Sequence, residues 1–176
     1  IPEELFHPVC AEEAFTIKDL TVNPMHISHD AADPVGYRFS YGSSHAAVCT
    51  DLGTYNDYTV ECLKGMDVLL LEANHDVNML QVGSYPYYLK QRILGECGHL
   101  SNEAAAEFAV ECVRAGTSDI LLAHLRDENN SPQLAEYTVG RALQASGLSV
   151  RLSAAPRDTI SEVHICRRSP SFASEN

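Results

Sequence analysis

Two short, uninterrupted apolar runs constrain the fold of this chain more than any other feature. They are DVLLLEA at residues 67–73 and DILLAHL at residues 119–125. Strands that are apolar on both faces are typical of parallel sheets covered by other layers, with helices joining the strands. Helical patterns lie between the two runs and after the second. The sequence therefore predicts a layered α/β structure in which helices cover a sheet.

The chain before residue 55 has a different, strand-rich pattern. Residues 15–17 and 20–27 predict strands joined by a turn, and residues 37–41 and 46–50 predict a hairpin about the sequence GSSH. From residue 55 the period becomes helical, and the segment YNDYTVECLKG ends in a glycine that suits a helix C-terminus. Strands therefore come first and alternate with helices later.

Three further helices are predicted from their capping residues. SYPYYLKQRIL has Pro86 in its first turn, SNEAAAEFAVECVRAG has Ser101 as cap, and SPQLAEYTVGRALQASG has Ser131 as cap. The second helix should bury an apolar face made of Ala105, Phe108, Ala109, Cys112 and Val113. A final pair of strands is expected at residues 150–152 and 160–165.

Length and composition indicate a soluble, cytoplasmic protein. With 176 residues, 45% of them hydrophobic, we expect one domain at residues 1–168 and a frayed tail at 169–176. No apolar run is long enough for a membrane span. The six cysteines are widely spaced without a CxxC pair, which favours reduced, buried thiols. Disulfides in a secreted domain are the alternative.

Four apolar strands are each followed at once by a side chain that can bind a metal or move a proton. These are His29 after MHIS, Asp51 after AVCT, Glu72 after VLLL and His124 after ILLA. A single such residue is commonly a structural histidine or a turn former. Four together indicate a functional site at the carboxyl ends of the strands.

The chemistry of these residues suits a transition metal. Imidazole and carboxylate ligands bind Zn²⁺, Mn²⁺ or Fe, and a carboxylate can bridge two ions. His26 and His29 are three positions apart in extended chain and should point to opposite faces, so we assign only His29 to the site. His29, Asp51 and His124 alone are too few for two complete coordination shells.

Six segments in a fixed order carry a family resemblance. With SHDAADPVGYRF, VCTDLG, LLLEANHD, YPYYLKQRI, GHLSNEAAA and LAHLRDENN, the chain resembles the metallo-β-lactamase-fold hydrolases, most closely the YycJ/WalJ-type group, over residues 15–163. The resemblance implies an αββα sandwich, of which this chain would form the second half without the N-terminal β layer. It also makes His29 and His124 metal ligands and Asp51 a bridging ligand.

The segment GHLSNEAA is similar to a ribonuclease Z segment in which a histidine protonates the leaving group. The resemblance therefore makes His99 and Glu72 a proton-transfer pair. The family's leading motif, His-x-His-x-Asp-His, is absent from this chain. We therefore expect a C-terminal portion whose partner is the missing N-terminal part. Two divalent ions, Zn or Mn, would bind the complete protein, and this chain alone would bind them weakly and be inactive.

The activity implied by the resemblance is metal-dependent hydrolysis of phosphodiester bonds, as a DNA exonuclease with a nucleic acid substrate and a setting in DNA repair. A net charge of -12 weakens this prediction, although bound cations can hold phosphates on an acidic protein. Hydrolysis of a small ester, thioester or cyclic phosphate is one alternative. A metal-free interaction module is the other.

Substrate contacts are expected on two of the predicted helices. Lys90 and Arg92, interleaved with Tyr85, Tyr87 and Tyr88, suit phosphates and stacked bases. An amphipathic helix with exposed cations explains the same pattern.

Ser101 and Asn102 begin a helix, where free N–H groups favour anions, and plain capping is the alternative. His75 is interpreted as structural, with a third metal-ligand role as the alternative.

Overall fold

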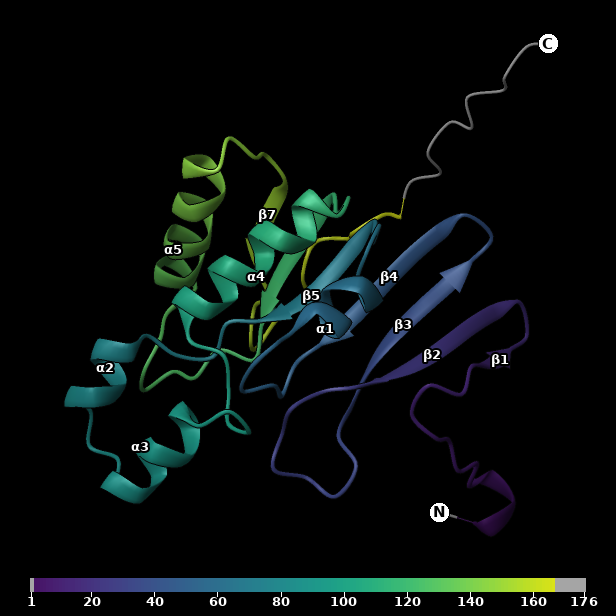
Figure 1. Ribbon diagram of the computed structural model, residues 1–176, viewed down its shortest axis with the longest axis horizontal. Helices are drawn as coiled ribbons and strands as arrows, with labels where there is room; N and C mark the ends of the chain where they lie inside the picture. Colours follow the sequence, from purple (N-terminus) through teal and green to yellow (C-terminus); the bar gives the residue numbers. More distant parts are fainter. Residues whose placement is uncertain (1, 167–176) are drawn as a thin grey trace.

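The seven strands of the computed structural model form a sheet in which the order along the chain is also the order in space (Figure 1). The structure describes residues 2–166. Strands β1 to β4 pair antiparallel, and β4 to β7 pair parallel. The strands are β1 (Phe15–Ile17), β2 (Leu20–His26), β3 (Val35–Tyr41), β4 (Ser44–Cys49), β5 (Val68–Glu72), β6 (Asp119–Ala123) and β7 (Arg151–Ala154).

The antiparallel opening and the later parallel strands confirm the α/β class. The predicted hairpin is confirmed as β3 and β4, with Tyr41 paired to Ser44 and Gly42 in the turn at φ 58°. Glycine suits this position because a left-handed backbone costs other L-residues free energy. Gly42 and Ser43 therefore form a two-residue turn, at the start of the predicted GSSH segment.

The helices begin at the caps that the sequence predicts. Ser101 Oγ accepts a hydrogen bond from Ala104 N, and Ser131 Oγ accepts one from Leu134 N. α2 was not predicted, although Asp76 caps it by accepting a hydrogen bond from Met79 N. The helices are the 3-10 helix η1 (Glu3–Leu5), α1 (Asp57–Cys62), α2 (Val77–Val82), α3 (Tyr87–Leu94), α4 (Asn102–Arg114) and α5 (Pro132–Ala145).

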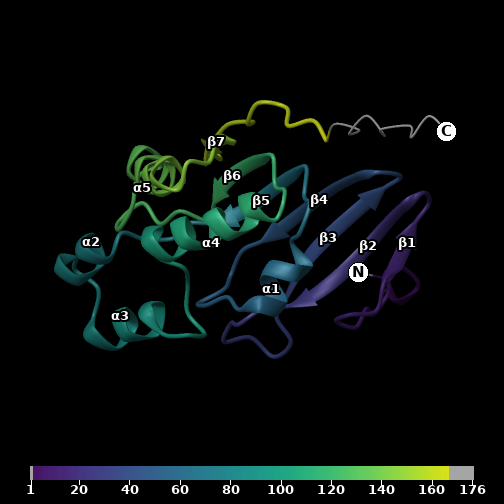
Figure 2. The same cartoon turned by 45° about the horizontal axis from the view of Figure 1, so that its top comes forward.

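The core lies between the sheet and the helices α1, α4 and α5, and Figure 2 shows α1 and α4 on the same face. Four of the five residues predicted for the apolar face of α4 are fully buried, while Val113 is partly buried. Phe108 stacks on Tyr55 at a centroid distance of 4.2 Å and an interplanar angle of 8°. α2 and α3 lie apart from this layer, beyond one end of the sheet (Figure 1).

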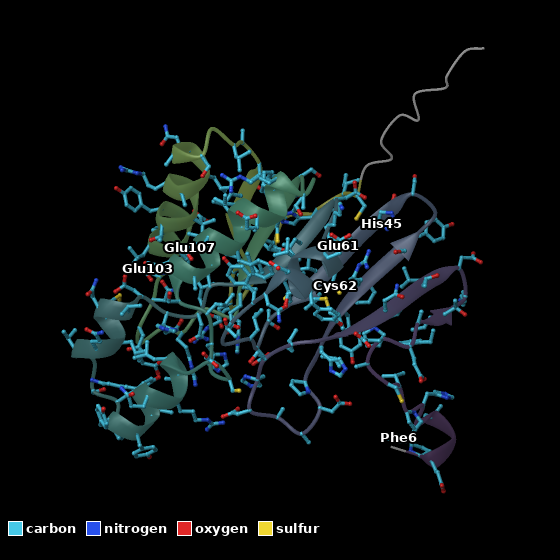
Figure 3. All side chains as sticks on the ribbon, viewed as in Figure 1. Phe6, His45, Glu61, Cys62, Glu103 and Glu107 are labelled. Atoms are coloured by element: carbon cyan, nitrogen blue, oxygen red, sulfur yellow. The ribbon has the colours of Figure 1, made fainter. Side chains whose placement is uncertain are left out.

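The exposed side of the helical layer is acidic. Glu61 on α1 and Glu103 and Glu107 on α4 are exposed to solvent, and Figure 3 places all three on these helices. They belong to a chain whose net charge is -12. Part of the negative charge therefore lies on the helices that cover the sheet.

The strand predicted at residues 160–165 is wrong. After β7 the chain is irregular and is held by side chains, with His164 Nδ1 donating to Asp119 Oδ2 at 2.8 Å and Arg151 donating to Glu162 at 2.9 Å. The apolar side chains of Ile160 and Val163 are exposed. An apolar pattern alone does not make a strand when the backbone finds no partner. The predicted tail at residues 169–176 lies outside the described residues.

All six cysteines are unpaired thiols, but the expectation that they are mostly buried is wrong. Cys49 and Cys112 are buried, whereas the others are half-buried or exposed because they lie on a short helix or in loops. Burial raises the pKa of Cys112 to about 12 and raises that of Cys49 still further from its usual range. These two thiols are therefore protonated and unreactive near neutral pH. Within residues 2–166, the helices are all too short or too polar to cross a bilayer.

Candidate active site at the carboxyl ends of the strands

The direction of the strands brings the four predicted strand-end residues to the same edge of the sheet. β4, β5 and β6 are parallel, and β2 runs in the same direction because both β2 and β4 are antiparallel to β3. Asp51, Glu72 and His124 therefore lie at neighbouring carboxyl ends. His29 follows β2 in the loop to β3 and lies close to Asp51, with its Nε2 3.8 Å from Asp51 Oδ1.

The buried carboxylate of Glu72 is the centre of the site. It is 0% exposed, and its Oε2 accepts a hydrogen bond from Leu52 N at 2.8 Å. Its Oε1 lies 2.8 Å from His99 Nδ1 and 2.9 Å from His124 Nδ1. Burial by itself raises the pKa of Glu72, but the hydrogen bonds from His124, His99 and Leu52 outweigh it, so the pKa lies below its usual value.

An ionised Glu72 determines the tautomers of both histidines. A carboxylate can only accept hydrogen bonds, so His99 and His124 must each donate from Nδ1. The same hydrogen bond raises the pKa of His124. The Nε2 atom of each ring then carries a free lone pair. This arrangement is typical of metal-binding histidines, in which one ring nitrogen binds the metal and the other donates a hydrogen bond to a carboxylate.

His29 has the same arrangement with a different partner. Its Nδ1 lies 3.1 Å from the carbonyl oxygen of Gly98 and donates to it, which leaves Nε2 free on the side of Asp51. The ring centroids of His29 and His99 are 5.1 Å apart, and those of His99 and His124 are 5.0 Å apart. Three imidazoles therefore lie side by side, each with one nitrogen available.

Two overlapping groups of these residues can hold metal ions. His29, Asp51 and His99 form one group and Glu72, His99 and His124 the other, with ligand atoms within 4.8 Å of one another in each group. Asp51 Oδ1 is also 3.6 Å from His124 Nδ1. Imidazole nitrogen and carboxylate oxygen suit zinc or manganese, so the donor chemistry fits. Each group offers fewer ligands than a closed four-coordinate site needs.

Two of the predicted metal ligands have strained backbones. Asp51 has φ 60° and His124 has φ 59°, in the left-handed region that is costly for residues other than glycine. Asn74, whose side chain is fully buried, donates from Nδ2 to the carbonyl oxygen of His124 at 2.8 Å. Asn74 therefore holds the strained turn that presents the His124 ring to the site.

Two glycines allow the loops that carry the site to pack closely. A Cβ atom at Gly53 would lie 2.4 Å from Gly98 N, and a Cβ at Gly98 would lie 2.2 Å from Ile93 O. Both distances are far below van der Waals contact, and the obstacles are backbone atoms. The loop after β4 therefore packs directly against the segment that carries Gly98 and His99.

The site opens into a cavity of about 210 Å³. On one side of it, Arg92 Nε donates to Asp30 Oδ2, and this hydrogen bond lowers the pKa of Asp30. Arg126 contributes a second cation. The cavity is lined by His29, Asp30, Asp51, Leu89, Arg92, Ile93, Gly98, His99, His124 and Arg126.

The other predicted substrate residues have structural partners away from the cavity lining. Lys90 Nζ donates to the carbonyl oxygens of Gln81 and Gly83, both at 2.7 Å. Ser101 caps α4, and Asn102 is buried and exchanges two hydrogen bonds of 2.9 Å with Asn130. Of the predicted substrate contacts, the structure brings Arg92 to the cavity.

Sequence reasoning missed two contributors to the site. Asp30 lines the cavity, and Asn74 supports His124. Both lie next to or near a predicted ligand or acid, so proximity to those residues was the available signal. The polar loop beyond His124 suits either substrate binding or a solvated connection by its sequence, and the structure brings its Arg126 to the cavity. The exclusion of His26 agrees with its position, since its side chain is exposed and faces Asp33 at 4.0 Å.

His75 is a buried histidine in the polar region behind the site. It is 1% exposed, and within residues 2–166 neither ring nitrogen has a hydrogen-bond partner. Burial lowers its pKa to about 4. A histidine whose pKa is lowered by folding makes its full contribution to the free energy of unfolding above the pKa of the unfolded state, about 6.5. This contribution is lost as the pH falls toward the pKa of the folded state.

We therefore expect acid to destabilise the protein through His75. Between pH 7 and pH 4.5, the free energy of unfolding should fall by about 2.5 kcal/mol more in the wild type than in His75→Leu. Urea unfolding at both pH values measures the difference. His26→Leu, at an exposed histidine, is the matched control and should behave as the wild type. An equal loss in wild type and His75→Leu would contradict this prediction.

Comparisons with known proteins agree with this geometry. Residues 2–125 match the family model described as "Beta-lactamase superfamily domain". The chain is 38% identical over 135 residues to "Exodeoxyribonuclease YycJ" of Bacillus anthracis and 39% identical over 144 residues to "Exodeoxyribonuclease WalJ" of Streptococcus pneumoniae. These matches cover 77% and 82% of the chain.

A solved structure supports the fold. The metallo-beta-lactamase fold protein YhfI from Bacillus subtilis is 19% identical and matches 85% of the chain with a TM-score of 0.62. The matched part is 51% of that protein. The chain likewise spans 51% and 54% of the two curated relatives, about half the length of each.

Proposed function

Because this chain belongs to the beta-lactamase superfamily, within its YycJ/WalJ-type group, we propose that its site hydrolyses phosphodiester bonds of DNA with the help of divalent metal ions. The observation that carries the proposal is the position of Glu72. One buried oxygen of this carboxylate accepts hydrogen bonds from His99 and His124, and so orients two imidazoles toward one cavity. Such an arrangement suits metal binding and proton transfer together.

Three residues would hold the metal ions, with help from other parts of the site. His29 and His124 would each bind through Nε2, the nitrogen that is not used in a hydrogen bond. Asp51 Oδ1 lies 3.8 Å from His29 Nε2 and 3.6 Å from His124 Nδ1, and its carboxylate can bridge two ions. When bound, two divalent ions lower the pKa of water and offset the charge of the phosphate in the transition state. The strained backbones of Asp51 and His124 keep their side chains directed to this point before any ligand arrives.

His99 would protonate the departing oxygen of the DNA. Its Nδ1 hydrogen is donated to Glu72, so a proton that enters the ring resides on Nε2. The adjacent carboxylate stabilises this imidazolium. His99 lines the cavity, so its Nε2 can reach a leaving group there.

The distribution of charge is compatible with an anionic substrate. The acidic side chains Glu61, Glu103 and Glu107 are exposed on the helical layer. The cavity is lined by two cations, Arg92 and Arg126, together with the carboxylates of Asp30 and Asp51. Metal ions would add positive charge where the phosphate binds. The two curated relatives are named exodeoxyribonucleases, which supports DNA as the substrate class.

The test uses the product of the complete open reading frame that contains these residues. With Mn²⁺ or Zn²⁺ added, it should release mononucleotides from linear DNA and lose this activity in EDTA. Parallel assays on RNA, small esters, thioesters and cyclic phosphates identify the alternative hydrolases of this fold. Bound metal with hydrolysis only of a small ester would overturn the proposal, as would a product that binds no divalent metal.

A further inference from the structure

We propose that Tyr85, Tyr88 and Arg92 form a rim beside the cavity that stacks the terminal bases of single-stranded DNA. This base-stacking rim deepens the proposed function and rests on it. Tyr88 and Arg92 are four residues apart in α3 and therefore lie on the same side of the helix. Arg92, Leu89 and Ile93 of this helix line the cavity. The exposed ring of Tyr88 thus lies one turn from a residue at the cavity wall.

Tyr85 connects the segment before α3 to the loop after β6. Its hydroxyl donates to Glu128 Oε2 at 3.1 Å. Glu128 belongs to the loop after β6 that also carries Arg126, a cavity residue. The segment with the tyrosines is therefore held close to the loop that follows His124.

The α2–α3 segment is rigid enough to act as a platform. Lys90 Nζ donates to the carbonyl oxygens of Gln81 and Gly83 at the end of α2. Ile93, 3% exposed, anchors the inner side of α3. A preorganised surface loses little entropy when a ligand binds, which favours recognition.

The exposed surface of this platform is aromatic, and its negative neighbours, Asp30 beside Arg92 and Glu128 beside Tyr85, come from other loops. Tyr88 is 74% exposed and its neighbour Tyr87 is also exposed. Residues 77–95 contain Lys90 and Arg92 but no carboxylate, in a chain with a net charge of -12. Aromatic rings beside cations bind single strands, because each base offers a flat face and each nucleotide a phosphate. Bases in a duplex are stacked on one another, so the rim should act on single strands or frayed ends.

The decisive experiment compares binding of DNA with and without bases. The metal-free product of the complete open reading frame is titrated into a fluorescein-labelled oligothymidylate and into an abasic strand of equal length, and the anisotropy is followed. Tyr88→Ala should weaken oligothymidylate binding by about 5-fold or more, the range that one stacked base contributes. It should leave binding of the abasic strand unchanged. Tyr88→Phe, which keeps the ring, should bind as the wild type.

The matched control is Tyr137→Ala on α5. Tyr137 is 62% exposed and, like Tyr88, has an arginine one turn further on, with Arg141 lying 5.8 Å from its ring. This variant should bind both strands as the wild type. An equal loss of affinity for the oligothymidylate and the abasic strand in Tyr88→Ala would overturn the base-stacking rim, and so would unchanged affinity for both. Binding of a protein ligand at Tyr88 without affinity for oligothymidylate would also overturn it.

The failure of this inference can be distinguished from failure of the proposed function. Hydrolysis of bis-p-nitrophenyl phosphate by the metal-loaded wild type, a phosphodiester without bases, tests the catalytic site alone. Metal-free binding of oligothymidylate tests the rim alone. An active enzyme with no base-dependent binding would refute the rim, and base-dependent binding without any hydrolysis would refute the function.

Discussion

Replacement of Glu72 by glutamine is expected to lower the rate of phosphodiester hydrolysis by about a thousandfold, within the range known for loss of acid–base catalysis. Glu72 accepts three hydrogen bonds, from Leu52 N and from the Nδ1 atoms of His99 and His124. A glutamine offers a single acceptor oxygen and an NH₂ group that can only donate. Because both imidazoles share Oε1 and Leu52 N uses Oε2, the NH₂ group must face either Leu52 N or the two imidazoles, so at least one donor loses its acceptor. The negative charge beside His99 would be absent in either case.

A second measurement makes this prediction independent of the activity assay. ¹⁵N chemical shifts of the histidine rings report which nitrogen carries the proton. In the wild type, His99 and His124 should be protonated at Nδ1, and in Glu72→Leu, which removes both acceptor oxygens, at least one should change tautomer. Glu61→Leu, at an exposed glutamate of α1, is the control and should alter neither rate nor tautomers. Unchanged tautomers in Glu72→Leu would refute the role given to this carboxylate.

Replacement of Asp51 by glycine is expected to separate metal affinity from stability. The carboxylate lies within 4 Å of both His29 and His124, so its loss should weaken binding of Zn²⁺ or Mn²⁺ by more than about 100-fold. The backbone at φ 60° favours glycine, which removes a left-handed strain of about 1 kcal/mol. The free energy of unfolding without metal should therefore be equal to or above that of the wild type.

Isothermal titration with metal and urea unfolding in EDTA measure the two quantities. Asp19→Gly, at an exposed turn residue, removes a carboxylate elsewhere and should leave metal affinity unchanged. If Asp51→Gly binds metal as tightly as the wild type, Asp51 is not a ligand. If it is strongly destabilised without metal, its carboxylate is a structural group of the loop.

Much of the site can be predicted from the sequence because the ends and directions of its strands can be. The apolar runs before Glu72 and His124 predicted neighbouring parallel strands, and parallel strands bring their carboxyl ends together. Residues without such a position were harder to predict. Lys90 and Arg92 are two positions apart in one helix, yet Lys90 binds carbonyl groups of α2 and Arg92 reaches the cavity. Only the packing of α2 and α3 determines which cation serves the site.

The same limit explains the missed strand and the missed helix. Residues 160–165 contain three apolar side chains, Ile160, Val163 and Ile165, but the tertiary structure offers His164 a buried carboxylate at Asp119 in place of a backbone ladder. The local signal for α2 is the cap Asp76, which accepts from Met79 N. Contacts with distant parts of the chain determine the secondary structure of such segments, and these contacts cannot be predicted from a single sequence.

The strand order of the sheet affects the order in which the residues of the site come together during folding. Because neighbours in space are neighbours along the chain, β1 to β5 can pair as soon as each has emerged during synthesis. The longest excursion separates β5 from β6, and its closure costs the most chain entropy. That closure also brings His124 to Glu72. During synthesis, the strands that lead to His29, Asp51 and Glu72 can thus pair before His124 joins them.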